Sequence, residues 1–217
     1  MKSFFSKYKH AWILLYFFIY LPWFLYLEQR QGIPHHMIHV SIDDYIPFNE
    51  YFIIPYLLWF LYVGGAIAYF FFRSKEDYYR LCTFLFTGMT VCLFICTVFP
   101  NGVDFRPVVD PDKNICSRLV TMIHAADTST NVFPSIHVFN SIGVHVAVMH
   151  SELLKKHHAV RMGSFVLMVS ICLSTVFLKQ HSVLDGFGAM LLAYSLYALV
   201  YKNSHERVWE EKPGDAY

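Results

Sequence analysis

Charged residues are scarce in this sequence. Asp, Glu, Lys and Arg make up 15% of its 217 residues, whereas hydrophobic residues make up 56% and aromatic residues 18%. Soluble domains have a charged fraction of about 25%, so this composition excludes an ordinary soluble domain. The formal net charge of +1 provides no basic excess of the kind that binds nucleic acid, and we expect no nucleic-acid partner. A mean hydropathy of +0.40 instead indicates an integral membrane protein.

Cysteines are few, and their number is odd. Of the five, four fall within apolar stretches, namely Cys82, Cys92, Cys96 and Cys172, so no disulfide framework is expected. Cys92 and Cys96 are four residues apart and could bind a soft metal, but buried cysteine is more often a small core residue. We therefore expect neither a metal nor another cofactor. Internal repeats and low-complexity linkers are also lacking, which predicts a single domain over residues 1–217.

Long apolar runs, by contrast, are abundant. A membrane-spanning helix needs about 20 mostly apolar residues, and six stretches qualify, at residues 11–27, 51–72, 81–99, 134–150, 162–178 and 184–201. They predict an all-α fold, a polytopic bundle of six transmembrane helices with longer connections at 28–50 and 100–133. The first run follows lysines, as a signal peptide does, but it is long and aromatic and no small-residue cleavage site follows it. We expect it to be a retained span.

Basic residues are distributed unevenly between the two sides of this predicted bundle. With the N-terminus inside, twelve fall on the inner side: Lys2, Lys7, Lys9, Arg73, Lys75, Arg80, Lys155, Lys156, Arg161, Lys202, Arg207 and Lys212. Five fall on the outer side: Arg30, Arg106, Lys113, Arg118 and Lys179. Because lysine and arginine are enriched in cytoplasmic loops, both termini are predicted to be cytoplasmic. Both long connections then lie at the extracytoplasmic face of a cell membrane.

Polar residues interrupt the apolar pattern where the predicted helix over 134–150 begins. Residues 131–145 read N-V-F-P-S-I-H-V-F-N-S-I-G-V-H. Proline suits the first turn of a helix, so we expect the helix to begin at Pro134. Its free backbone N–H groups and the Ser135 hydroxyl would form an anion site at the outer face. His137 falls in that first turn.

Two further polar stretches are predicted at the same face. In F-L-K-Q-H-S-V-L-D-G, residues 177–186, His181 and Asp185 are four apart, which places both on one face of a helix. The carboxylate can then fix the imidazole tautomer and make the other ring nitrogen a better nucleophile or base. The stretch F-P-N-G-V-D-F-R-P, residues 99–107, contributes Arg106, and Arg118 follows. A guanidinium there could bind phosphate through paired N–H groups.

Taken together, the three stretches resemble the type 2 phosphatidic acid phosphatase superfamily of six-helix membrane lipid phosphatases. That family carries Lys, six residues and Arg-Pro, then Pro-Ser-Gly-His, then Ser-Arg, five residues, His, three residues and Asp. The matching residues here, in the same order, are Arg106-Pro107, Pro134-Ser135-x-His137, Ser174 and His181-x-x-x-Asp185.

The sequence also departs from that family at three positions. Phe99 stands where the family has its first lysine, Ile136 replaces the glycine, and Thr175 replaces the arginine of the third signature. With two cations missing, the pattern looks more like the branch that contains inositol phosphorylceramide and sphingomyelin synthases. Those enzymes transfer a phospho-headgroup between lipids rather than releasing phosphate.

The resemblance implies a metal-independent mechanism with a phosphohistidine intermediate. His181, oriented by Asp185, would attack phosphorus, and His137 would give a proton to the leaving alkoxide. The substrate would be a membrane phospholipid, and the acceptor would be water or a lipid or polyol alcohol. Lipid phosphate phosphatase activity on a phosphomonoester or pyrophosphate lipid is the alternative to headgroup transfer.

The resemblance also suggests which groups stabilise the transferred phosphoryl oxygens. These candidates are Arg106, Ser135, Lys179 and Arg118. Whether Lys179 or Arg118 replaces the missing family cations is left open, as is whether His124 and Asp127 belong to the site.

Other histidines leave different interpretations open. His35 and His39 have helical metal-ligand spacing, but no recognised motif supplies them with further ligands, so an interfacial loop is favoured. His157 and His158 follow two lysines and are expected to be solvated. His145, deep in a predicted span, must face the bundle interior or a water cavity; hydrogen bonding to another helix is favoured over a proton path. A non-catalytic lipid-binding protein, or a haem protein or transporter, remains the alternative of another class.

Overall fold

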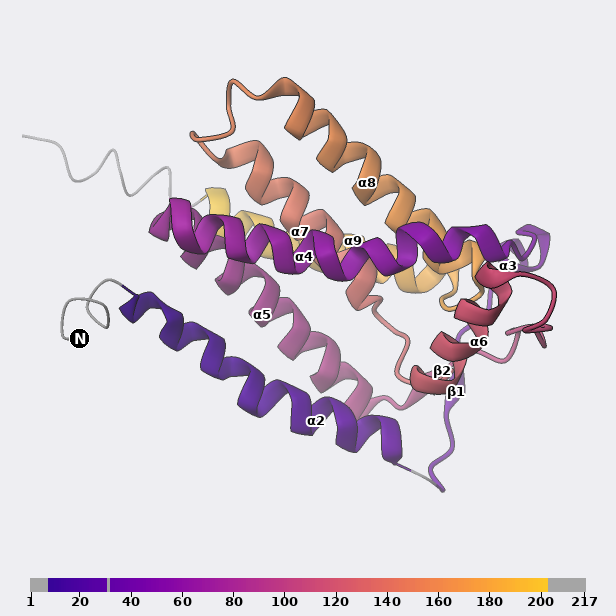
Figure 1. The fold of residues 1–217 in the computed structure, drawn as a ribbon. Helices are drawn as coiled ribbons and strands as arrows, with labels where there is room; N and C mark the ends of the chain where they lie inside the picture. The colour runs from indigo at the N-terminus through magenta and orange to yellow at the C-terminus, as the bar shows by residue number, and fades with distance from the viewer. Residues whose placement is uncertain (1–7, 31, 203–217) are drawn as a thin grey trace, which may run out of the picture.

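The computed structural model describes residues 8–30 and 32–202, and their regular structure is almost entirely helical (Figure 1). The long helices are α2 (Phe17–Gln29), α4 (Ile53–Arg73), α5 (Lys75–Val98), α7 (Ile136–His150), α8 (His158–Phe177) and α9 (Val183–Tyr197). A 3₁₀ helix, Lys9–Tyr16, precedes α2, another, Glu50–Phe52, precedes α4, and a π-helical turn, Ala198–Lys202, follows α9. The predicted all-α class is confirmed.

Five helices in the described residues are long and apolar enough to cross a membrane. They are Lys9–Gln29, Glu50–Arg73, Lys75–Val98, His158–Phe177 and Val183–Tyr201, which is the pattern of a multi-pass membrane protein. The remaining predicted span, residues 134–150, forms α7, an apolar helix of 15 residues. At 1.5 Å per residue it is shorter than the roughly 30 Å hydrocarbon core. The number of six spans therefore stays a prediction.

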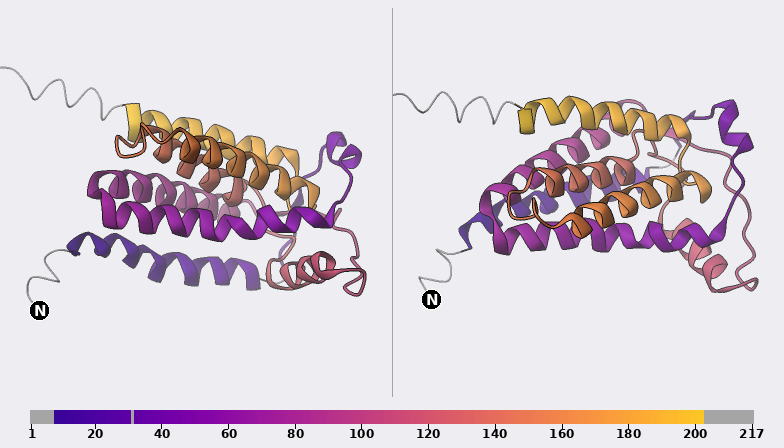
Figure 2. Two further views of the ribbon diagram at one scale, coloured as in Figure 1. Left: turned by 45° about the horizontal axis from the view of Figure 1, so that its top comes forward. Right: turned by 90° about the horizontal axis from the view of Figure 1, so that it is seen from above.

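Helix α7 lies at the centre of the bundle, in contact with α4, α5, α8 and α9 (Figures 1 and 2). Its residues Phe139 and Val144 are completely buried. The short helix therefore packs on four other helices of the bundle along its length.

Close packing between α5 and α7 forms the middle of the hydrophobic core. The rings of Phe84 and Phe139 stack with centroids 5.0 Å apart and an interplanar angle of 4°. Each ring lies against a glycine of the other helix: a Cβ on Gly88 would lie 2.0 Å from Phe139, and one on Gly143 would lie 2.7 Å from Phe84. The two glycines therefore allow the interleaved rings and the short distance between the helices.

The two ends of the bundle differ in structure. One end carries the short turns that join α4 to α5 and α7 to α8; the other carries the long connections (Figures 1 and 2). These connections contain α3 (Ser41–Tyr45), α6 (Ile115–Ala126), which the sequence had not predicted, and the parallel pair β1 (His36–Met37) and β2 (Asn101–Gly102). We call this second end the loop end and the first the turn end.

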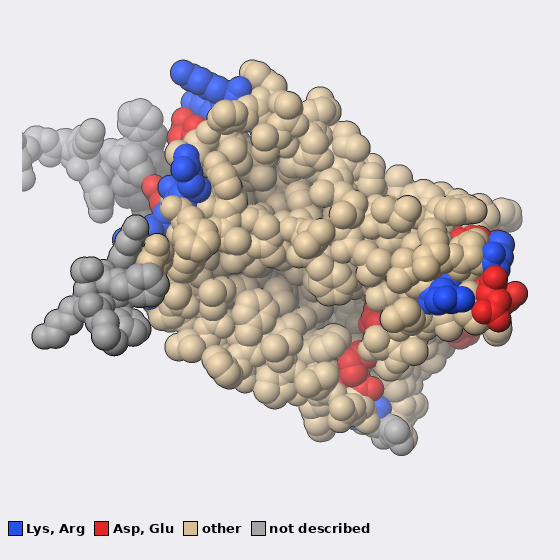
Figure 3. All heavy atoms as spheres, in the orientation of Figure 1, with Lys and Arg blue, Asp and Glu red and all other residues tan. Residues whose placement is uncertain are grey.

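Charged side chains gather at these two ends and leave a broad uncharged band between them (Figure 3). The described segments at the turn end carry Lys9, Arg73, Lys75, Arg80, Lys155, Lys156 and Arg161. Lys2, Lys7, Arg207 and Lys212 lie outside the described residues. The band has the composition expected where lipid hydrocarbon meets protein. The side of the membrane that each end faces stays a prediction.

The glycine contact between α5 and α7 predicts a stability difference. Gly88→Ala places a methyl group 2.0 Å from an atom of the Phe139 ring, which forces a clash and should lower the free energy of unfolding by about 1–3 kcal/mol. Gly64→Ala on α4 is the control, because nothing lies within 4 Å of its Cβ position. It should be neutral or slightly stabilising. Thermal unfolding in detergent measures both, and equal melting temperatures would contradict the packing described here.

Candidate functional site

A cavity of about 440 Å³ lies at the loop end, between α2, α4 and the start of α7. Its polar lining includes His137, His181, Arg106, Asp127 and Glu28. Aromatic residues of α2 and α4 complete much of the wall, namely Phe17, Tyr20, Phe24, Tyr56, Trp59 and Phe60. We call it the histidine cavity. An apolar cavity with a few convergent polar groups is the usual form of a small-molecule site.

His181 lies in the turn between α8 and α9, beside the Asp185 carboxylate. Its Nδ1 is 3.3 Å from Asp185 Oδ2, and both side chains are buried. The same oxygen accepts the Ser182 N–H at 2.9 Å, and the Ser182 side chain accepts from Leu184 N–H. The predicted pair therefore forms, but His181 precedes the helix. The spacing works because Ser182 and Asp185 form a capping box at the start of α9.

Asp43, from the short helix α3, fixes this turn from the other side. Its carboxylate accepts the Ser182 hydroxyl at 2.6 Å and the Val183 N–H at 2.9 Å, and its backbone carbonyl accepts from Lys179 Nζ. The Lys179 ammonium also lies over the Phe105 ring, 5.6 Å from its centroid. Lys179, predicted to bind phosphate, is thus buried outside the lining of the histidine cavity. It links the turn before α9 to α3 instead.

His137 lies in the first turn of α7, as predicted, with its ring beside that of His181. The two ring centroids are 5.7 Å apart, and the rings of Tyr56 and Trp59 lie 4.6 and 4.5 Å from His137. Helix α7 begins at Ile136 with Ser135 as N-cap, two residues later than the predicted start. The aromatic rings restrict the orientation of the His137 imidazole.

Ser135 is completely buried, and its hydrogen bonds are made with backbone groups. Its hydroxyl accepts the Val138 N–H at 3.4 Å, and its own N–H donates to the Asp185 carbonyl at 3.2 Å. This last bond joins the start of α7 to the start of α9. It holds the two elements that carry His137 and His181 against each other.

The two predicted arginines have different environments. The Arg106 guanidinium lines the cavity and donates to the Asp127 and Thr128 carbonyls at 2.6 and 2.8 Å, while its buried Nε has no partner in the described part of the chain. Burial lowers the pKa of Arg106 from its ordinary value, although Asp127 opposes the shift. Arg118 is exposed, 3.7 Å from Asp112 Oδ1, and does not line the cavity. The structure brings only Arg106 to the histidines.

Two carboxylates in the cavity wall add negative charge. Asp127, left open by the sequence, accepts the Tyr56 hydroxyl at 3.0 Å. Glu28, which the sequence analysis missed, accepts from the Thr128 hydroxyl at 2.6 Å and from Asn131 Nδ2 at 3.0 Å. The signal for Glu28 was an acidic residue directly after the first apolar run. Its approach to a segment 100 residues later has no local signature.

Several other residues singled out in the sequence lie elsewhere. Phe99 stacks on His36 with centroids 4.6 Å apart, outside the cavity lining. Thr175 is buried and donates to the Cys172 carbonyl, whereas Ile136 lines the cavity. His124 is also outside the cavity lining, and its Nε2 has no partner among the described residues. Burial, and to a smaller extent the charge of Arg106, lower the pKa of His124.

Two other histidines, His39 and His145, contact polar side chains, whereas His157 and His158 are exposed, as expected. His39 lies 2.9 Å from the exposed Asp44 carboxylate, and His145 Nδ1 lies 3.1 Å from the Ser164 hydroxyl on α8. The second contact matches the favoured interpretation of His145, hydrogen bonding to another helix. Across residues 8–30 and 32–202, no group of three or more His, Cys, Asp or Glu side chains is placed to hold a metal ion.

Comparisons with protein-family models, with curated proteins and with solved structures find no match. What the protein does must therefore be argued from the histidine cavity and its chemistry.

The turn that carries His181 predicts a test of Asp43. Asp43→Ala leaves the buried Ser182 hydroxyl and Val183 N–H without their acceptor, which should lower the free energy of unfolding by about 1–3 kcal/mol. Asp44→Ala is the matched control, because the neighbouring carboxylate is exposed and pairs with exposed His39. Melting temperatures in detergent compare the two. A loss of equal size in both variants would contradict the role given to Asp43.

Proposed function

We propose that the protein is a membrane lipid phosphotransferase or phosphohydrolase that works through a phosphohistidine on His181, as in the type 2 phosphatidic acid phosphatases. The arrangement of His181 carries the proposal: Asp185 contacts one ring nitrogen, and the ring of His137 lies 5.7 Å away in the wall of the same cavity. A nucleophile with an orienting carboxylate and a second proton-transfer group is the minimal set for this chemistry.

In the first step, Asp185 keeps the His181 proton on Nδ1, so the Nε2 lone pair attacks phosphorus. An N–P bond forms while the bond from phosphorus to the leaving oxygen breaks, and His137 as an imidazolium gives that oxygen a proton. In the second step, neutral His137 takes a proton from the acceptor hydroxyl as it attacks phosphorus. The N–P bond breaks, and both histidines return to their initial states.

Arg106 supplies positive charge to the equatorial oxygens during both steps. Its guanidinium is held by two backbone carbonyls, so it is oriented before substrate binds, which is how electrostatic stabilisation is most effective. None of these steps requires a metal ion.

The negative charge of the cavity favours headgroup transfer over phosphate release. A phosphomonoester carries about −1.5 to −2 charges at neutral pH, whereas a phosphodiester carries one. Glu28 and Asp127 line the cavity together with one arginine, Arg106. These carboxylates repel a dianion more strongly than a monoanion. We therefore favour transfer of a phosphodiester headgroup to a lipid or polyol alcohol. Hydrolysis of a phosphomonoester or pyrophosphate lipid is the second candidate, supported by Arg106.

The apolar wall of the cavity suits a lipid substrate. Leu21 of α2 and Phe60 of α4 line it and are also exposed on the surface of the bundle, Leu21 by half and Phe60 by slightly more than half. The cavity thus reaches the face that hydrocarbon would cover, so acyl chains can remain in the membrane while the headgroup meets the histidines. We place the reaction at the extracytoplasmic face of a cell membrane, from the basic residues at the turn end.

Substitution of the two residues of the nucleophile pair should give different losses. His181→Ala should abolish turnover of a mixed phospholipid extract followed by mass spectrometry. Asp185→Asn should retain slow turnover, reduced about 10²–10⁴-fold, because the nucleophile remains but is poorly oriented. A chelator should have no effect. His39→Ala, at an exposed histidine, is the control; full activity in His181→Ala would disprove the phosphohistidine scheme.

Removal of a carboxylate should change the substrate preference. Glu28→Gln removes one negative charge and keeps one acceptor oxygen, which can still serve Thr128, while the other oxygen becomes an amide NH2 that no longer accepts from Asn131. It should raise phosphate release from a monoester lipid, relative to headgroup exchange from a diester lipid, by about tenfold. Asp112→Asn, the same change at an exposed site outside the cavity, should leave the ratio unaltered. Rapid phosphate release by the unmodified protein, with no exchange to any alcohol, would identify a phosphatase instead.

A further inference from the structure

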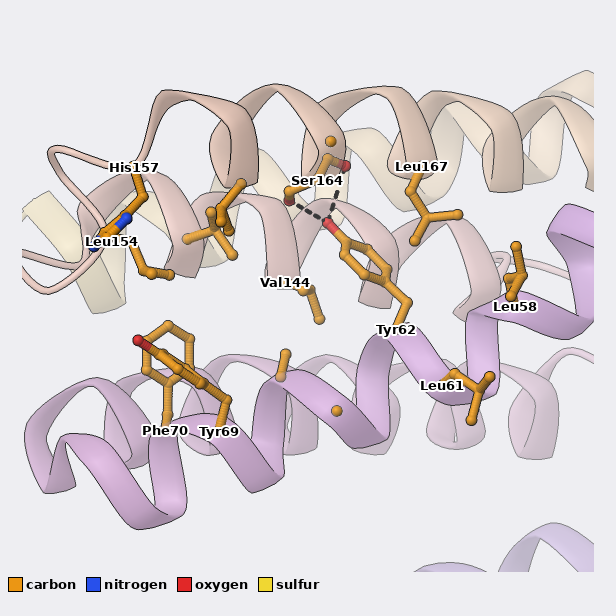
Figure 4. Close-up of a pocket in the computed structure, with 15 residues that line it drawn as sticks. Leu58, Leu61, Tyr62, Tyr69, Phe70, Val144, Leu154, His157, Ser164 and Leu167 are labelled. Carbon is orange, nitrogen blue, oxygen red and sulfur yellow. Dashed lines mark hydrogen bonds between the residues drawn. The ribbon is translucent and has the colours of Figure 1, made fainter.

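A second hollow, of about 640 Å³, lies between α4, α7 and α8 (Figure 4) and shares no lining residue with the histidine cavity. It runs from Leu58 and Leu61 at one end to Leu154 and His157 at the other. We call it the α4–α8 groove. Its volume falls within the roughly 300–1,000 Å³ of typical small-molecule sites, and its lining is almost entirely apolar.

The groove opens on the surface that hydrocarbon would cover. Leu61 and Val160 line it and are 73% and 47% exposed. Both belong to helices that are long and apolar enough to span a membrane, Glu50–Arg73 and His158–Phe177. Whatever fills the groove therefore enters from the lipid phase, and an acyl chain has the required chemistry.

A hydrogen bond joins α4 and α8 partway along the groove. The Tyr62 hydroxyl, on α4, lies 2.6 Å from the Ser164 hydroxyl on α8, and it donates to the Ser164 carbonyl at 3.2 Å (Figure 4). His145 Nδ1 of α7 lies 3.1 Å from the same Ser164 hydroxyl. Three helices meet at this point, so their spacing is fixed by polar contacts inside an apolar region. The groove is formed before any ligand enters.

Small residues leave room along both sides. Gly65 of α4 and Gly163 of α8 line the groove, and nothing lies within 4 Å of a Cβ built on either. A whole helix is about 10–12 Å across, and over the roughly 30 Å hydrocarbon core it needs several times the volume available here. A single hydrocarbon chain fits this space better than a helix of a partner.

Basic residues lie at the His157 end of the groove. Lys155 and Lys156 stand between the lining residues Leu154 and His157, and Arg161 follows Val160. The acidic residue of this segment, Glu152, pairs with Lys155 at 3.3 Å on the surface, and Asp77 of α5 is engaged by the Ser151 hydroxyl at 2.8 Å. The groove thus ends in a net positive segment, which attracts anionic phosphate.

From this combination we propose that the α4–α8 groove binds one acyl chain of an anionic phospholipid, with its phosphate beside Lys155, Lys156 and His157. The site lies toward the turn end and so takes lipid from the leaflet opposite to the histidine cavity. It does not depend on the proposed reaction, because no residue of the histidine cavity takes part.

The test is native mass spectrometry of the purified protein titrated with phosphatidylglycerol or phosphatidylcholine of identical acyl chains. Unmodified protein should bind the first phosphatidylglycerol more tightly than phosphatidylcholine. Gly65→Leu fills the groove and should weaken that binding about tenfold or more, because a side chain replaces lipid methylenes. Gly64→Leu is the matched control, because Gly64 is the residue next to Gly65 on α4 and also has nothing within 4 Å of its Cβ position, but does not line the groove.

The double variant Lys155→Gln/Lys156→Gln separates charge from shape. It should lower phosphatidylglycerol affinity about fivefold for each lysine and leave phosphatidylcholine affinity unchanged. If Gly65→Leu does not fold, Gly163→Leu replaces it, since the same open space surrounds that position. Equal binding of the two lipids by unmodified protein, or equal effects of Gly65→Leu and Gly64→Leu, would overturn the proposal. A dimer that Gly65→Leu dissociates would assign the groove to a second copy of the chain instead.

Discussion

The arrangement of the candidate site depends on one buried carboxylate. Asp185 has no exposed surface, and a charge in such a place must be satisfied by hydrogen bonds. The carboxylate oxygen Oδ2 contacts His181 and accepts the Ser182 N–H, whereas the buried Oδ1 has no partner among the described residues; the backbone carbonyl accepts the N–H of Ser135. These three contacts order the turn before α9 and join it to the start of α7. His137 and His181 are neighbours because both elements meet at Asp185.

Asp43 adds a second buried acid to the same turn. It binds the Ser182 hydroxyl and the Val183 N–H, so the segment that carries His181 is held from both α9 and the short helix α3. Reactive groups held by such surrounding contacts keep their geometry when substrate binds. The long connections at the loop end therefore have a structural purpose, since they bring α3 and Arg106 to a site built on α7 and α9.

The bundle presents two hollows of different character. The histidine cavity is lined by Arg106 and by the carboxylates of Glu28 and Asp127, a combination that suits a substrate with little net negative charge. The α4–α8 groove is apolar along its length and basic at one end. Both are bounded by α4 and α7, the first near the loop end and the second toward the turn end.

The sequence by itself determined the features that depend on neighbours along the chain. Hydropathy over about 20 residues identified the apolar helices. The four-residue spacing of His181 and Asp185 predicted their contact, because a capping turn, like a turn of helix, joins residues that are close in sequence. His137 was likewise placed correctly in the first turn of its helix, although that helix starts after Ser135 rather than at Pro134. Tertiary structure decided which charges meet these groups. Glu28 approaches Thr128, and Lys179 turns to Asp43 rather than to the cavity, through contacts more than 90 residues apart in the chain. No local pattern encodes such contacts, since they depend on how whole helices pack.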